Sequence, residues 1–115
     1  RKMKKIKVYR QIKVQGIRYK EAIECEKLNE YLAIYKDKDK VTNGVIIDIK
    51  TGLAVAYGKY KKDVIETFNF IFSKRYYEYV QTKEYEEEIK RFNELEEYHQ
   101  EIAFDDSESE LDNED

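Results

Sequence analysis

The sequence contains one cysteine, one histidine, no proline and no tryptophan. Because Cys25 stands alone, an internal disulfide and a multi-cysteine metal cluster are both excluded. No apolar run approaches the roughly 20 residues that a membrane-spanning helix needs, and the N-terminus lacks the apolar core of a secretory signal. These absences predict a cytoplasmic protein that makes no membrane contact.

Charge is abundant and unevenly distributed. Charged residues make up 41% of the 115 residues, and the formal net charge is only −3. Residues 1–62 hold 17 Lys/Arg against 7 Asp/Glu, whereas residues 63–115 hold 5 against 18. Such asymmetry is typical of proteins with electrostatic partners or a charged tail. The alternative is that the two halves simply attract each other within the fold.

The first half has the patterns of β-structure. Ile6, Val8, Ile12 and Val14 alternate with lysine and glutamine side chains, which predicts a half-buried strand that ends near Gly16. The next segment, residues 17–29, fits either a short helix or a strand. The run at 31–35 favours another strand, and a charged loop is expected over 37–43.

A β-hairpin is the clearest local signal. A β-branched run at 45–49 is followed by Lys50-Thr51-Gly52, and an apolar segment returns over 53–57. Gly52 supplies the positive φ that a tight hairpin loop requires. Because both faces of the hairpin are apolar, we expect it at the centre of the sheet.

Helical periodicity dominates after Gly58. A long helix is predicted to begin near residues 60–62, with Asp63 in its first turn and an apolar stripe on one side. Thr82 is placed to cap a second, acidic helix, although one long bent helix also fits. The first stripe is Ile65, Phe68, Phe72, Tyr76 and Tyr79, and the second is Tyr85, Ile89, Phe92, Leu95 and Ile102.

The order of these segments predicts an α+β fold. We expect an antiparallel sheet of about four strands, followed by a long helix and a second acidic helix packed on one face. A single domain would span residues 1–104, with the basic sheet region at 1–62 and the helical region at 60–102. Residues 105–115 carry seven acidic and no basic side chains, which predicts a disordered tail.

Catalytic patterns are weak. His99 follows Glu96 by three residues on the predicted helix, but di-iron bundles need two such pairs and further glutamates, so a surface histidine is favoured. Cys25 lies between Glu24 and Glu26, which oppose formation of its thiolate. The sequence contains no nucleophile elbow, phosphate loop or dinucleotide fingerprint. We therefore expect a protein that is not an enzyme and needs no cofactor or metal.

Two groups of lysines are candidates for binding phosphate or RNA. One group shares a face of the first strand, and the other lies at the start of the long helix, where backbone amides also favour an anion. The layout is similar to double-stranded RNA-binding domains, although their N-terminal helix is not visible here. A solvated face that aids solubility is the alternative. These lysines are Lys5, Lys7, Lys13, Lys59, Lys61 and Lys62.

The second helix carries the candidate acidic surface. Its glutamates lie opposite or beside the apolar stripe, and pairs such as Glu86–Lys90 and Glu87–Arg91 neutralise only part of their charge. Rows of carboxylates on a rigid helix can imitate a nucleic-acid backbone and occupy a cationic channel. An ordinary acidic helix is the alternative. The candidate residues are Glu84, Glu87, Glu88, Glu94, Glu97 and Glu101.

Residues 49–68, IKTGLAVAYGKYKKDVIETF, resemble a pattern found in small proteins of Gram-positive phages and mobile elements. Short acidic members of that population include type II anti-CRISPR inhibitors. The resemblance implies a phage protein, a location in the host-cell cytoplasm, and an acidic, DNA-mimicking surface that blocks an RNA-guided nuclease. It covers about a fifth of the chain and assigns no role to any individual residue.

Three functions follow from these patterns. The first is a non-catalytic inhibitor that binds a nucleic-acid-handling enzyme or its RNA complex, with a type II RNA-guided nuclease as the specific candidate. The second is a nucleic-acid-binding module that uses the lysine faces and is inhibited by its own acidic tail. The third is a protein–protein adaptor or homodimer formed through tyrosines that core packing leaves over.

Overall fold

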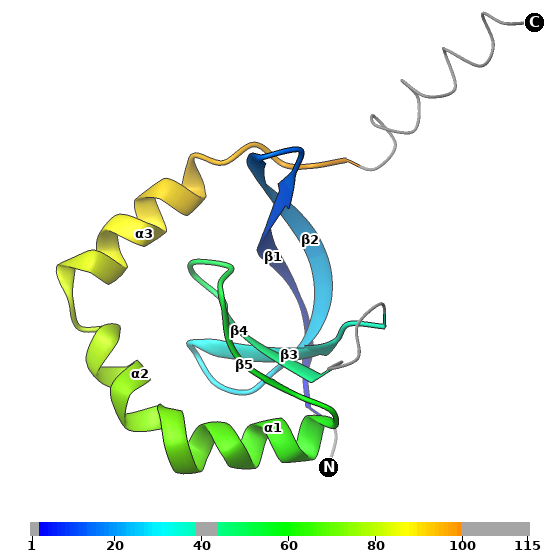
Figure 1. Cartoon of the computed structure of the whole chain (residues 1–115), viewed down its shortest axis with the longest axis vertical. Helices are drawn as coiled ribbons and strands as arrows, with labels where there is room; N and C mark the ends of the chain where they lie inside the picture. The colour runs from blue at the N-terminus through cyan, green and yellow to red at the C-terminus, as the bar shows by residue number, and fades with distance from the viewer. Residues whose placement is uncertain (1–2, 39–43, 100–115) are drawn as a thin grey trace, which may run out of the picture.

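The computed structural model describes residues 3–38 and 44–99. Five strands form one antiparallel sheet in sequence order, and the helical segments follow them (Figure 1). The α+β prediction is confirmed, with five strands in place of about four. The strands are β1 (Lys5–Val14), β2 (Ile17–Lys27), β3 (Leu32–Lys36), β4 (Gly44–Asp48) and β5 (Ala54–Gly58).

The first two strands form a long hairpin. Their register runs from Lys5↔Glu26 to Val14↔Ile17, and the two turn residues, Gln15 and Gly16, have φ values of 52° and 83°. Positive φ at both positions is typical of a type I′ turn, whose twist matches the flanking strands. The ambiguous segment 17–29 is therefore mainly strand, because its alternating side chains pair with those of β1.

The sheet curls because the long hairpin leaves it. Only Glu26 and Lys27 of β2 pair with β3, and the rest of the hairpin turns away (Figure 1). The β4–β5 turn then reaches the hairpin, where the amide of Gln11 donates to the carbonyl of Gly52 at 2.9 Å. The strand order places β4 inside the sheet and β5 at its edge, so the expected central position holds for only one strand of the β4–β5 hairpin.

Two apolar clusters occupy opposite faces of the central strands. Ile46 belongs to the cluster under the helices, and its neighbour Ile47 packs against Val8 and Cys25 of the long hairpin. Successive side chains of a strand point to opposite faces, so this β-branched strand is buried on both sides. The apolarity of both faces thus reflects helices on one side and the curled hairpin on the other.

The helical region follows one side of the sheet in an arc (Figure 1). Its segments are α1 (Lys61–Thr67), a single π-helical turn η1 (Phe68–Phe72), α2 (Ser73–Tyr79) and α3 (Lys83–Asn93). The helix is interrupted at residues 80–82, so the alternative of one long bent helix is wrong. Thr82 caps α3 as predicted, since its hydroxyl oxygen accepts from the amide of Tyr85 at 3.2 Å.

The predicted apolar stripes are only partly buried. Phe68 and Tyr76 are buried, but Phe72 is 41% exposed and Tyr79 is 37% exposed. The physical reason is the π turn, whose i→i+5 bonding adds a residue to the turn and shifts the stripe around the helix. In the second stripe Tyr85 and Phe92 are buried, and Ile102 lies outside the described residues.

The last described segment is extended, not helical. Helix α3 ends at Asn93, whereas the helical region was expected to reach 102. Lys20 of β2 donates its amide to the carbonyl of Glu96 at 3.0 Å and accepts from the amide of Tyr98 at 2.8 Å. These bonds attach the segment to the free edge of β2. The predicted tail, 105–115, lies outside the described residues.

Replacing Gly52 with alanine is expected to lower the free energy of unfolding by about 2–4 kcal/mol. Its φ is +69°, and a Cβ would lie 2.6 Å from both the carbonyl oxygen of Tyr9 and the Phe92 ring. The matched control is Gly16→Ala, where φ is also positive but a Cβ meets nothing within 4 Å, so strain alone should cost about 1 kcal/mol. Urea unfolding measures both losses, and equal losses would contradict the close contact between this turn and β1.

Candidate binding surfaces

A buried carboxylate at the end of β4 positions the helices. Asp48 is 1% exposed, and its Oδ1 accepts from the amides of Lys50 and Thr51 at 2.9 Å and from the Thr51 hydroxyl at 3.0 Å. The Tyr76 hydroxyl of α2 donates to Oδ2, and the Tyr85 hydroxyl of α3 donates to the same oxygen at 2.9 Å. One carboxylate therefore joins the β4–β5 turn to two helices.

None of these donors carries a charge, so no cation offsets the negative charge of Asp48 beside the two tyrosines. Burial raises the pKa of Tyr76 and of Tyr85, and the neighbouring Asp48 charge raises each pKa further. Both phenols therefore stay protonated and remain donors to Asp48. The sequence offered one signal for this cluster, a lone aspartate at the end of a β-branched run, but its tyrosine partners lie 28 and 37 residues away.

The predicted acidic residues separate into two groups. Glu84, Glu87 and Glu94 are exposed at or next to α3, while the side chain of Glu88 is only 13% exposed. Glu97 is exposed and accepts from the Tyr9 hydroxyl at 3.5 Å, a long contact. Glu101 lies outside the described residues.

Glu88 faces the long hairpin. Its carboxylate accepts from the side-chain amide of Gln11 at 2.9 Å and from the guanidinium of Arg91 at 2.7 Å. Burial raises the pKa of Glu88, but the two hydrogen bonds and the charges of Arg91 and Arg18 outweigh burial and leave the pKa lowered. Arg91 thus pairs with Glu88, three residues before it, and not with Glu87 as expected. The Glu88 side chain helps to hold α3 against the hairpin.

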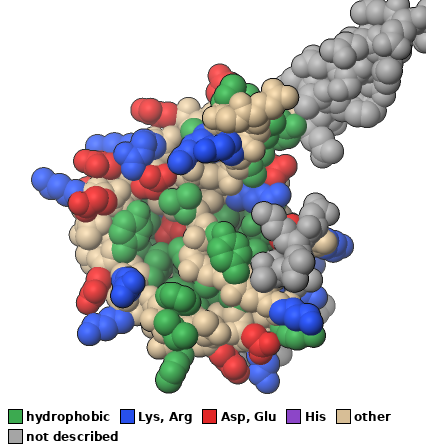
Figure 2. Space-filling model, viewed as in Figure 1, with side chains coloured by type: hydrophobic (Ala, Val, Ile, Leu, Met, Phe, Trp, Pro, Cys, Tyr) green, Lys and Arg blue, Asp and Glu red, His purple; other side chains and the backbone are tan. Residues whose placement is uncertain are grey.

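The acidic excess lies beyond α3. Helix α3 itself has four glutamates and three Lys/Arg side chains. The described residues together hold 19 Lys/Arg and 16 Asp/Glu, whereas residues 100–115 hold eight Asp/Glu and no Lys/Arg. The part of the chain that the structure describes is therefore slightly basic, and Figure 2 shows acidic and basic side chains intermixed on the face it presents.

The predicted lysines do not form one surface. Lys13 is exposed near the tip of the long hairpin, opposite Arg18, and Lys7 lies over the Tyr9 ring at 5.3 Å. At the start of α1, the Lys59 ammonium lies 5.6 Å from the Tyr60 ring centroid, and Lys62 is exposed. The two predicted groups meet only at Lys5 and Lys61.

That meeting point is a basic hollow of about 310 Å³, which we call the lysine hollow. Its wall includes two glutamates, one of which, Glu26, forms an ion pair with Lys61. Sequence reasoning missed two of its members, because Lys36 ends the short strand β3 and Lys38 follows it. Only the pairing of β1 and β3 with the same end of β2 brings these two lysines near Lys5. The four lysines that line it are Lys5, Lys36, Lys38 and Lys61.

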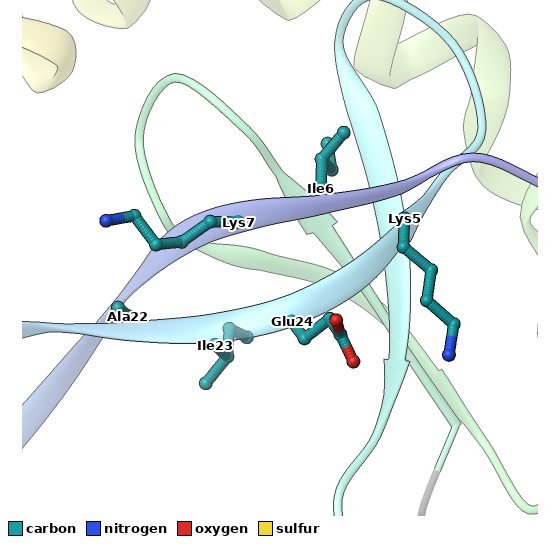
Figure 3. A pocket seen from close by; sticks show the side chains of 6 residues that line it. All are labelled: Lys5, Ile6, Lys7, Ala22, Ile23 and Glu24. Atoms are coloured by element: carbon teal, nitrogen blue, oxygen red, sulfur yellow. The ribbon is translucent and has the colours of Figure 1, made fainter.

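A second, shallow hollow lies over the long hairpin and is lined by residues of β1 and β2 (Figure 3). In Figure 3 the ammonium groups of Lys5 and Lys7 point away from each other, and the Glu24 carboxylate projects toward the same side as the Lys5 ammonium. A compact phosphate site needs groups that converge on one point. These lysines instead distribute charge along the hairpin.

The candidate catalytic residues are not assembled into a site. Cys25 is 2% exposed, and burial raises its thiol pKa to about 11, with the Arg10 charge opposing and the Glu24 charge adding to the shift. Glu96 and His99 lie in the extended segment, so the expected helical Glu-x-x-His pair does not form. Within residues 3–38 and 44–99, no group of three His, Cys, Asp or Glu side chains is placed to hold a metal ion.

Comparisons with family models, curated proteins and solved structures give no match to this chain. In the part that the structure describes, no helix is long and apolar enough to cross a membrane. Any functional conclusion therefore depends on the surfaces themselves.

Replacing Tyr85 with phenylalanine should lower the free energy of unfolding by about 1.5–3 kcal/mol, because the buried Asp48 charge loses a donor. The control is Tyr60→Phe at a residue that is 59% exposed, where the change should stay within about 0.5 kcal/mol. Chemical denaturation measures both values. Similar losses in the two variants would show that the Asp48 cluster does not hold α3.

Proposed function

We propose that this chain is a non-catalytic inhibitor that binds a nucleic-acid-handling enzyme through its acidic C-terminal part. A type II RNA-guided nuclease is the specific candidate, and the cationic groove that normally holds its nucleic acid would be the contact. In this role the chain acts as an anti-CRISPR protein.

The observation that supports this proposal is the orientation of α3. Tyr85, Phe92 and Glu88 fix its inner side to the sheet and the long hairpin, so that Glu87 and Glu94 face outward. Residues 83–115 together hold fifteen Asp/Glu and three Lys/Arg. The acidic run therefore begins on a rigid helix, which lowers the entropy cost of presenting its first carboxylates to a cationic partner.

Capture of a purified type II nuclease–guide complex by this chain should succeed at low salt and weaken as salt rises, because exposed charges are screened. The Glu87→Gln/Glu94→Gln variant should bind roughly fivefold more weakly. The control, Glu24→Gln/Glu30→Gln, makes the same charge change at exposed positions in and just after β2, outside α3. No capture at low salt, or equal weakening by both variants, would overturn the proposal.

A second function, direct binding of nucleic acid, is supported by the lysine hollow. It collects four lysines from three separate parts of the chain, and only two glutamates line it with them. Lys/Arg contacts with phosphates release counterions and provide affinity that depends little on sequence. In this function the acidic C-terminal residues compete with phosphate for the same lysines.

Removal of the residues after Phe104 eliminates seven acidic side chains and should strengthen binding to DNA or RNA in a mobility-shift assay. In the truncated chain, Lys36→Ala/Lys38→Ala should weaken the shift, whereas Lys83→Ala/Lys90→Ala on α3 should not. Absence of a shift with either nucleic acid would exclude this second function.

A further inference from the structure

The π turn presents apolar side chains to solvent. Phe70 is 92% exposed, Ile71 is 62% exposed and Phe72 is 41% exposed, and the three are consecutive. Hydrophobic side chains project from the lower edge of the molecule in Figure 2, where α1, η1 and α2 run in Figure 1. Large apolar residues that protrude together from a surface are typical of an interaction site.

The local sequence supports a contact surface at this turn. No charged residue occurs from Phe68 to Ser73, in a chain whose charged content is 41%. A π turn inside a helix costs hydrogen-bond geometry and is found frequently at functional sites. Here it removes Phe72 from the buried stripe and adds it to the exposed group.

Side chains at equal distances before and after Phe70 in the sequence carry opposite charges. Exposed residues at four-residue steps along this helical stretch alternate in sign on either side of the phenylalanine, in the order Lys62, Glu66, Phe70, Lys74 and Glu78. If two copies of the stretch lie antiparallel and cross at Phe70, Glu66 of each copy faces Lys74 of the other.

We infer that this surface, which we call the Phe70 face, is the contact of a two-fold symmetric homodimer of this chain. An isologous contact requires a patch that is complementary to itself, and the Phe70 face meets that requirement in both its apolar centre and its charged flanks. Antiparallel helices pack readily through such a stripe, with the apolar side chains between them.

The contact is small. A single helical face provides less than the roughly 800 Å² per partner of a standard stable interface, so the dimer is weak and forms in proportion to concentration. The Asp48 cluster, α3 and the lysine hollow lie outside this face. The dimer is therefore independent of the functions proposed above.

Sedimentation equilibrium of the full chain over a concentration series should show monomers and dimers in exchange. Phe70→Ser should weaken dimerisation at least roughly tenfold. Tyr57→Ser is the matched control, since it removes an exposed aromatic ring, 60% exposed, from β5 and should leave dimerisation unchanged. A chain that stays monomeric up to about 1 mM, or a Phe70→Ser variant that associates like the parent, would overturn the inference.

Charge reversal tests the antiparallel geometry. Glu66→Lys and Lys74→Glu each place like charges opposite each other in a homodimer, so each variant alone should dimerise several-fold more weakly. A mixture of the two variants restores two opposite-charge pairs and should form a heterodimer with near-parental affinity. The double variant Glu66→Lys/Lys74→Glu should recover as well. Failure of both rescues would overturn the antiparallel arrangement, and circular dichroism would confirm that each variant is folded.

Discussion

The buried carboxylate of Asp48 is the interaction on which the arrangement of the layers depends. Taking a charge out of water costs several kcal/mol, and this site has to offset that cost with neutral donors from a turn and two helices. Because the donors come from separate elements, satisfying the carboxylate also fixes where the elements lie. The Tyr76 and Tyr85 hydroxyls bring α2 and α3 to the β4–β5 turn. Gly52, four residues after Asp48, brings the same turn to the long hairpin.

The acidic surface follows from this constraint. With Tyr85 held at Asp48, the side of α3 that includes Glu88 meets the hairpin and the opposite side faces solvent. The lysine hollow has a different cause, because Glu26 of β2 pairs with Lys5 of β1 on one side and with Ile34 of β3 on the other. That pairing assembles the hollow from residues that are far apart in the sequence. The outward glutamates thus follow from the Asp48 cluster, and the hollow follows from the order of the strands.

The sequence was sufficient to predict those elements that depend only on interactions between neighbouring residues. The alternation in β1, the positive φ of Gly52 and the cap supplied by Thr82 each depend on a few neighbouring residues, and the structure has all three. The π turn could not be predicted in this way, because the apolar stripe around Phe72 also fits an ordinary α-helix. Only packing against the sheet decides which side chains of this stretch face inward. The strand-like pairing of residues 96–98 depends on the free edge of β2, which exists only once the hairpin has left the sheet. The lysine hollow depends on the pairing of β1 and β3 with the same end of β2, so only half of its lysines could be named from the sequence.

The contrast between a basic and an acidic half invites a structural explanation, in which each half neutralises the other. Four ion pairs of the described residues argue otherwise. Arg10 pairs with Glu21 and Asp37, and Lys61 pairs with Glu26, all within the first 62 residues, while Arg91 pairs with Glu88 within the second half. Where the halves meet at Glu88, the hairpin supplies the neutral Gln11 amide as donor, and the charge of Arg18 acts without an ion pair. Among the described residues, these contacts hold α3 in place without pairing the basic half with the acidic half. Exposed side chains such as Lys13 and Lys62 on one side of the division, and Glu87 and Glu94 on the other, therefore keep the opposite signs that electrostatic partners would recognise.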